Sequence, residues 1–179
     1  MTVQRSTISN NTALGDAADN GGGGVFNNGG NLMIQNSTLA NNSATGLAGK
    51  GGAAYNISGG TLDLTNSTLS GNDANDNGGA IDNNGTLNLL YNTITLNTSS
   101  GSGGGIAQEL VAGASASLEG NLIAGNNANG FGQDFVNLGS SVSSQGYNLI
   151  GIDDASNFPA QASDCLLYTS PSPRDLSTS

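Results

Sequence analysis

The stretch that decides the fold is Leu62–Asn72, which reads LDLTNSTLSGN. Its first three residues alternate apolar, polar and apolar, the period of a strand with one buried face. A polar corner follows at Asn66, a second short run is centred on Leu69, and the stretch closes on Asn72. Asn and Gly supply turns and tolerate left-handed backbone. The stretch therefore predicts two very short strands separated by a corner.

Copies of this stretch recur along the chain, reading VQRSTISNN from Val3, LMIQNSTLANN from Leu32, LNLLYNTITLN from Leu87 and LEGNLIAGN from Leu118. In the alignment, one apolar position holds Ile8, Leu39, Leu69, Ile94 and Ile123, spaced by 31, 30, 25 and 29 residues. A second apolar position holds Val3, Ile34, Leu64, Leu89 and Leu118. An amide position holds Asn11, Asn42, Asn72, Asn97 and Asn126. Internal repeats of this length indicate a stacked array.

A second, glycine-led element follows each copy, reading GGVFN from Gly23, GAAYN from Gly52, GAIDN from Gly79 and GGIAQ from Gly104. Small residues belong where a coil bends tightly or where sheets approach closely. Between the two elements lie segments of variable length, at 12–22, 43–51, 73–78 and 98–103. We expect these segments to be loops that protrude from one side of the array.

Strands of three to five residues are too short to be stable alone. Each can pair with its equivalent one repeat later, about 4.8 Å away. The apolar positions then become interior stacks, and the Asn position becomes a ladder of amides. The sequence therefore predicts an all-β fold, a right-handed parallel β-helix (solenoid) of about five coils with 25–31 residues each. A β-propeller and a leucine-rich repeat are disfavoured because their signatures are absent.

The texture TLxLxNSTxSGN followed by GGAI or GGGI resembles the right-handed parallel β-helix repeats of the pectin-lyase-like superfamily. It is similar in particular to bacterial secreted or surface-anchored repeat proteins, whose terminal repeats resemble 121–126 and 144–151. More distantly it resembles the chlamydial polymorphic outer membrane proteins, which carry Phe at a corner position where this chain has Leu or Ile. The resemblance covers about residues 1–152. It implies an extracellular or cell-surface, adhesin-like role.

The domain prediction has three parts, with β-helix repeats at 1–152, an irregular continuation at 153–164 and a foreign tail at 165–179. Residues 165–175 read CLLYTSPSPRD and resemble a translated sequencing adapter. A genuine Pro/Ser linker is the alternative. If the tail is an adapter, its lone Cys165 carries no functional information, the tail is disordered, and the natural chain continues beyond about Asp164.

Charge and composition restrict the classes of partner. The chain carries 13 acidic and 3 basic residues, a net charge of −10. Such a surface repels phosphate backbones and anionic membranes, which disfavours nucleic-acid binding. No apolar run is long enough to span a bilayer and no signal peptide is evident. Glycans and a host or neighbouring cell surface remain as expected partners.

Catalytic residues are hard to find in this chain. Lyases and hydrolases of the superfamily need clustered carboxylates together with Arg, Lys or His, and the chain has no His. Outside the tail its basic residues are Arg5, at a corner position, and Lys50, which we expect to be exposed in a glycine-rich loop. We therefore expect no catalytic residue and no cofactor-binding residue.

The weaker candidates for binding are three carboxylates and two aromatic residues. Asp73, Asp76 and Asp82 lie near one loop and the strand after it, and they could bind Ca²⁺, which takes several oxygen ligands. Three solvated loop acids are the favoured alternative. Tyr55 and Phe26 could stack against sugars, although packing is the favoured explanation. The leading functional hypothesis is a non-catalytic structural or adhesin-like repeat region. The alternative is a fragment of a carbohydrate-active enzyme or a glycan-binding module with its active residues elsewhere.

Overall fold

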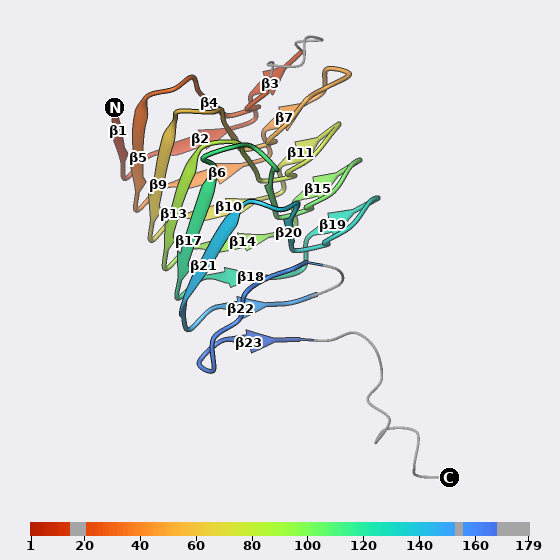
Figure 1. The fold of residues 1–179 in the computed structure, drawn as a ribbon. Helices are drawn as coiled ribbons and strands as arrows, with labels where there is room; N and C mark the ends of the chain where they lie inside the picture. Colours follow the sequence, from red (N-terminus) through yellow and green to blue (C-terminus); the bar gives the residue numbers. More distant parts are fainter. Residues whose placement is uncertain (15–20, 153–155, 168–179) are drawn as a thin grey trace.

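The computed structural model describes residues 1–14, 21–152 and 156–167, which form short strands and turns without a helix (Figure 1). The chain winds into a parallel β-solenoid of about five coils with four parallel sheets. Each of the five complete coils contributes one strand to every sheet, and each strand pairs with its equivalent in the next coil. The all-β solenoid predicted from the repeats is confirmed.

The first sheet contains β1 (Thr2–Gln4), β5 (Asn31–Gln35), β9 (Thr61–Thr65), β13 (Thr86–Leu90), β17 (Ser115–Glu119) and β21 (Ser141–Gly146). The second contains β2 (Thr7–Ser9), β6 (Thr38–Ala40), β10 (Thr68–Ser70), β14 (Thr93–Thr95), β18 (Leu122–Ile123), β22 (Leu149–Ile150) and β23 (Cys165–Leu166). The third contains β3 (Thr12–Ala13), β7 (Ser43–Ala44), β11 (Asp73–Ala74), β15 (Thr98–Ser99) and β19 (Asn127–Ala128). The fourth contains β4 (Val25–Asn27), β8 (Ala54–Asn56), β12 (Ile81–Asn83), β16 (Ile106–Gln108) and β20 (Phe135–Asn137). The coils are numbered from the strand of the first sheet with which each begins, so β5 to β8 form the second coil.

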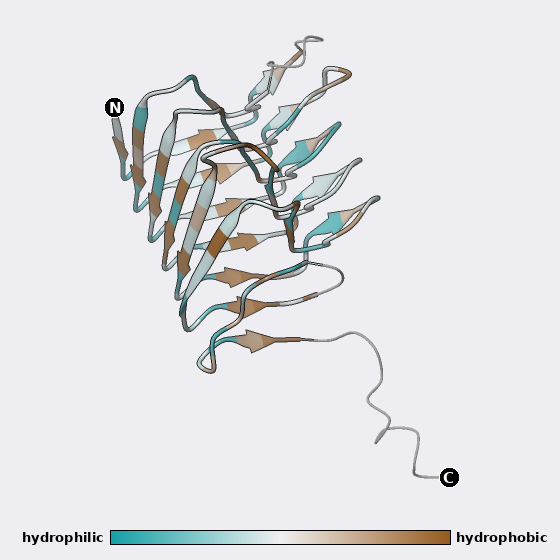
Figure 2. Ribbon diagram, in the orientation of Figure 1, coloured by the Kyte–Doolittle hydropathy of each residue, from teal (hydrophilic) through white to brown (hydrophobic). Residues whose placement is uncertain are grey.

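Both apolar series lie in register, as the alignment of the repeats requires. In the second sheet Ile8 pairs with Leu39, and the series continues to Ile123 and then to Ile150. In the first sheet the series runs from Val3 to Leu118. The inner members are buried in one continuous core. Figure 2 shows the hydrophobic segments recurring at the same place in successive strands of the second sheet.

The predicted Asn positions form a hydrogen-bonded ladder inside the corner after the second sheet. Asn72 Nδ2 donates to Asn97 Oδ1 at 2.8 Å, and the same oxygen accepts the backbone N–H of Asn72 at 3.0 Å. The same pair of contacts joins Asn11 to Asn42 and every later step as far as Asn126. At the end of the series Asp134 Oδ1 accepts both bonds from Asn126 at 2.8 Å. A carboxylate only accepts hydrogen bonds, so Asp134 ends the ladder without needing a further coil.

Two further ladders were not predicted from the sequence. One follows the last residues of the fourth sheet, where Asn27 donates to Asn56, Asn56 to Asn83 and Asn83 to Gln108 at 2.7–2.8 Å. The other follows the corner after the first sheet and contains Ser37, Ser67, Asn92, Asn121, Asn148 and Asp164. The second ladder is hard to recognise because Ser replaces Asn in its early coils.

The segments expected to be loops are not loops throughout, because they contain the strands of the third sheet. Each begins with a two-residue strand, such as Asp73–Ala74, before the chain projects from the column (Figure 1). The glycine-led element that follows is in tight contact with the next coil. A Cβ on Gly79 would lie 2.1 Å from the carbonyl oxygen of Gly104, and one on Gly52 would lie 2.3 Å from that of Gly79. Only glycine allows this approach.

Part of the tail that was expected to be disordered, Cys165–Leu166, forms a strand. This strand, β23, lies beside β22, and Leu166 packs against the core. A strand edge pairs with any extended segment that reaches it, because the hydrogen bonds come from the backbone. Phe158, in the segment expected to be irregular, contacts Phe135 edge-on with ring centroids 5.4 Å apart. Residues 168–179 lie outside the described part of the chain.

The first prediction concerns the buried apolar series. We expect Leu64→Asp or Leu89→Asp to destabilise the fold by at least about 4 kcal/mol, because each introduces a lone carboxylate into the core. Thr65→Asp, on the same strand as Leu64 but not buried, is the control. Urea unfolding monitored by circular dichroism measures the difference. Equal midpoints for Leu64→Asp and Thr65→Asp would show that the register is wrong.

The second prediction concerns the Asn ladder. Asn72→Ala removes the acceptor for Asn42 and the donor to Asn97 and to the Leu39 carbonyl oxygen. We expect a loss of about 3 kcal/mol in the free energy of unfolding, because buried partners lose their hydrogen bonds. Asn88→Ala is the control, since its amide contacts Asp63 at the surface and its loss should cost less than about 1 kcal/mol. A ladder variant as stable as this control would contradict the structural role of the amides.

Candidate functional site

The outer face of the fourth sheet carries the polar cluster most suited to chemistry. Successive strands place Phe26, Tyr55, Asp82, Ala107 and Val136 in register at their middle positions. The flanking residues of each strand, such as Ile81, face the core, so the middle side chains point away from it. The last four are nevertheless at most 2% exposed. Segments from neighbouring coils therefore cover this face.

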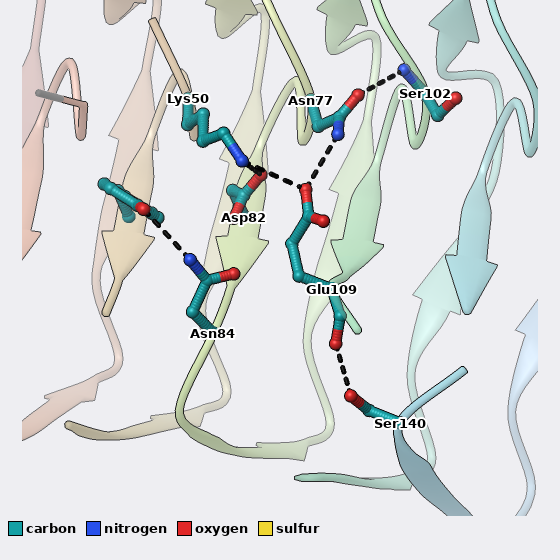
Figure 3. A network of polar contacts seen from close by, with 8 residues as sticks. Lys50, Asn77, Asp82, Asn84, Ser102, Glu109 and Ser140 are labelled. Carbon is teal, nitrogen blue, oxygen red and sulfur yellow. Dashed lines mark hydrogen bonds and ion pairs between the residues drawn. The ribbon is translucent and has the colours of Figure 1, made fainter. Parts of the chain in front are cut away.

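Four charged or amide side chains from three coils meet on this covered face. Figure 3 shows the Lys50 ammonium directed toward the carboxyl groups of Asp82 and Glu109. Lys50 Nζ lies 3.3 Å from Glu109 Oε1 and 3.9 Å from Asp82 Oδ2. Asn77 Nδ2 donates to Glu109 Oε1 at 2.7 Å, and Asn77 Oδ1 accepts the backbone N–H of Ser102 at 2.8 Å. We call Lys50, Asn77, Asp82 and Glu109 the outer-sheet cluster.

Asp82 is the buried member of the outer-sheet cluster. Its side chain is 0% exposed, and as an ionised carboxylate it would have no hydrogen-bond donor within reach. Burial raises the pKa of Asp82 well above 3.8, and the negative charge of Glu109 adds to the rise although Lys50 opposes it. As a protonated acid, Asp82 can donate its proton to a hydrogen bond with Glu109. The site therefore favours a neutral carboxylic acid at position 82.

The other two ionisable groups are held in their charged forms. Burial opposes ionisation of Glu109, but the hydrogen bond from Asn77 and the charge of Lys50 outweigh it and bring the pKa of Glu109 below 4.5. Burial also opposes the charge on Lys50, but Asp82 and Glu109 raise its pKa above 10.5. The cluster therefore favours an ammonium at Lys50, a protonated acid at Asp82 and a carboxylate at Glu109. Two carboxyl groups with pKa values moved apart are typical of acid/base pairs.

Access limits what the outer-sheet cluster can do to external molecules. The side chains of Lys50 and Glu109 are 18% and 15% exposed, and Asp82 is closed off. Tyr55, which accepts a hydrogen bond from Asn84 Nδ2 at 3.0 Å, covers one side and stacks on Phe26 with centroids 5.6 Å apart. Tyr55 is 2% exposed, so its ring packs within the protein and offers no free face to a sugar.

Two expectations about charged residues need correction, and the corner position expected for Arg5 is confirmed. Lys50 was expected to be exposed, but it is partly buried in two ion pairs because the chain around it folds over the fourth sheet. Asp82 is neither solvated nor in a loop, since it lies on β12. Arg5 lies at an exposed left-handed corner with φ 47°, equivalent to those of Asn36 and Asn66.

The structure does not bring the three candidate calcium ligands into one site. Asp73, on β11, accepts a hydrogen bond from Thr98 Oγ1 at 2.5 Å, whereas Asp76 follows in the projecting segment and Asp82 lies behind Lys50. Within residues 1–14, 21–152 and 156–167, no group of three or more His, Cys, Asp or Glu residues could hold a metal ion.

Glu109 and Asn77 were missed by the sequence analysis. Neither occupies a position that recurs in the repeat, and Lys50 is 59 residues from Glu109 along the chain. The available signal was the placement of Glu109 directly after the GGIAQ element.

Comparisons with known proteins add no identification. No family model, no curated protein and no solved structure gives a significant match to the chain. Over the described residues, no helix is long and apolar enough to cross a membrane.

The third prediction concerns pH. Folded Asp82 keeps its proton to a higher pH than the unfolded chain, so its stabilising effect is complete below pH 3.8 and is lost as the pH rises through its folded pKa. Protonation of Glu109 changes the free energy of unfolding only as the pH falls below 4.5, and deprotonation of Lys50 changes it only as the pH rises above 10.5. Between pH 4.5 and pH 10.5, Asp82 is therefore the group of this cluster that lowers the free energy of unfolding as the pH rises through its folded pKa. The negative charge of nearby Asp76 also raises the pKa of Asp82.

The measurement is urea unfolding at several pH values. We expect Asp82→Asn to abolish the decline, whereas Asp63→Asn, on the exposed side of the first sheet, keeps it. A decline of the same size in the Asp82→Asn variant would assign it to other groups.

Proposed function

We propose that residues 1–152 serve as a non-catalytic, adhesin-like structural column of a secreted or cell-surface bacterial protein. The observation that carries the proposal is the use made of the repeated residues. The apolar positions fill the core and the Asn positions form internal ladders, so these repeated residues serve to stack the coils. What is repeated from coil to coil is the means of stacking.

The outer surface of the column is better suited to presenting the projecting segments to a partner than to catalysing a reaction. The projecting segments after the third-sheet strands lie along one side (Figure 1). A net charge of −10 with few charged residues gives a polar, weakly acidic surface. Such a surface favours solubility and disfavours nucleic-acid partners. We infer glycans or a host or neighbouring cell surface as the partners that the projecting segments contact.

The texture of the repeats supports placing the column outside the cell. Its resemblance to pectin-lyase-like repeats, to surface-anchored bacterial repeat proteins and, more distantly, to polymorphic outer membrane proteins rests on the Asn-Ser-Thr corners and the GGAI elements. Because one fold hosts many activities, this resemblance bears on architecture and location more than on chemistry.

A glycan-binding or carbohydrate-active module is the second candidate, favoured by one hollow near the end of the column. This hollow of about 470 Å³ is lined by Phe131, Val136, Asn137, Leu138, Gly139 and Asn157. Phe131 is 67% exposed. An exposed ring beside amide groups is suited to stacking on a sugar and bonding its hydroxyls.

The fourth prediction tests the column by single-molecule pulling. Because each coil contacts mainly its neighbours, we expect stepwise unravelling with released lengths of about 3.4 Å per residue of a coil. Asn72→Ala should lower the force of the steps that involve its coil and the coils joined to it by the outer-sheet cluster, and leave the steps of the remaining coils unchanged. Smooth extension at low force would oppose a mechanical role.

Incubation with acidic polysaccharides separates the two candidates. The column requires that no new reducing or unsaturated chain ends form. Turnover that disappears in Asp82→Asn or Glu109→Gln would support the enzyme. Saturable glycan binding lost in Phe131→Ala would support the binding module, whereas glycan binding that is kept in Phe131→Ala would fit contacts made elsewhere on the projecting segments of the column.

A further inference from the structure

The outer-sheet cluster combines the three groups that amide formation needs. An amine at Lys50 Nζ lies 3.9 Å from Asp82 Oδ2 and 3.3 Å from a carboxylate oxygen of Glu109. Asp82 is fixed on β12 between β8 and β16, and both of its oxygens are buried without a hydrogen-bond donor. Most buried carboxyl groups are satisfied by such donors. The unsatisfied carboxyl group facing an amine therefore calls for an explanation.

We propose that the folded chain joins Lys50 Nζ to the side-chain carboxyl carbon of Asp82 in an intramolecular amide bond, with Glu109 as the proton acceptor. The bond ties the second coil to the third. It needs no cofactor and no second protein, since the amine, the acid and the base are all supplied by this chain. This proposal is independent of any ligand of the column.

The step balances in atoms and charge. Lys50 gives one ammonium proton to Glu109, and the freed lone pair attacks the Asp82 carboxyl carbon to form the C–N bond. The C–O bond to the Asp82 hydroxyl then breaks, and the hydroxyl leaves as water with a second proton from the Lys50 nitrogen. Ammonium, acid and carboxylate become amide, water and a protonated Glu109, so the cluster carries no net charge before or after the step. Nothing is oxidised or reduced.

The protonation states explain why Asp82 is the electrophile although Glu109 is nearer to the amine. An amine attacks a neutral carboxylic acid much more readily than a carboxylate, whose charge repels the lone pair. Burial keeps the proton on Asp82, whereas the hydrogen bond from Asn77 helps to keep Glu109 ionised. The same arrangement makes Glu109 the base.

The surroundings favour condensation over hydrolysis. Asp82 is 0% exposed, and Tyr55 and Ala107, its neighbours on the adjacent strands, are 2% and 0% exposed, so bulk water has little access to the carboxyl carbon. Reacting groups held in place gain an effective concentration of about 10⁵ M or more. The flexible Lys50 side chain needs to move its nitrogen by only a short distance, while the acceptor stays fixed in the sheet.

The test is the mass of the folded, full-length chain. We expect an intact mass lower than that of the sequence by one water molecule. Trypsin digestion of the denatured chain gives a second readout, because the chain has three basic residues, Arg5, Lys50 and Arg174. An amide on Lys50 blocks cleavage there, so fragment 6–174 is expected, lighter by one water, in place of 6–50 and 51–174. Fragmentation of this product locates the bond.

The time course of water loss shows whether the bond forms when the chain folds or arises during preparation of the protein. Chain purified in denaturant starts at full mass, and we expect the water to be lost only after transfer to folding buffer. The decline of stability with rising pH predicted for Asp82 belongs to the unlinked chain, so it should be present before the bond forms and disappear as the bond forms, because Lys50 and Asp82 no longer titrate. The linked chain should also melt at a higher temperature, since the closed loop restricts the unfolded chain.

Variants assign the roles. Lys50→Arg and Asp82→Ala should keep full mass, and Glu109→Gln should slow the loss of water at least about 100-fold. Glu119→Gln, on β17 outside the cluster, should react like the parent chain.

Three results would overturn the proposal. One is a folded parent chain that keeps full mass and is cut completely after Lys50. The second is a bond located at Glu109 or Asp76. The third is an unchanged rate in Glu109→Gln, which would remove Glu109 as the base. The parent-chain measurement decides the first point even where a variant fails to fold.

Discussion

The structure depends on one constraint, which is that every buried polar group of a coil must find its partner in the next coil. The corner amides meet it by hydrogen-bonding along the axis, as Asn72 does to Asn97, while the same oxygen accepts a backbone N–H. A coil displaced by one residue would leave both amide and backbone unsatisfied inside the column. The ladders therefore fix the register that the apolar stacks alone would specify less strictly, because Leu and Ile pack in several arrangements.

The same constraint explains how two of the ladders terminate. Asp134 and Asp164 stand where a further coil would supply an amide, and as acceptors they satisfy Asn126 and Asn148 without demanding a donor in return. Gln133 does the same for the strand edge, since its side-chain amide exchanges two hydrogen bonds with the backbone of Ala128. Phe158 covers the exposed end of the core beside Phe135. Side chains thus replace the missing neighbour at several places.

How far the sequence predicts the molecule follows from what is repeated. The apolar and Asn positions could be aligned because each occurs in every coil, and alignment in a solenoid is contact in space. Ser67 and Asn92 share a ladder although their side chains differ, so the pattern hid that contact. The outer-sheet cluster was not predicted, because Lys50, Asn77 and Glu109 occupy positions that do not recur from coil to coil and meet only when the chain covers the fourth sheet. The strand at Cys165–Leu166 was also missed. It pairs with β22 through backbone hydrogen bonds, which do not require particular side chains.

These non-repeating residues also change the energetics of the array. In a column held only by neighbouring contacts, each coil can loosen with little effect on coils further away. Lys50 belongs to the second coil and Glu109 to the fourth, so their ion pair spans the third coil, and Asn77 of that third coil bonds Glu109 as well. Opening any one of these coils must then break contacts made by the other two. The cluster turns three coils into one cooperative block, and it does so on the outer face, where the repeated ladders do not reach.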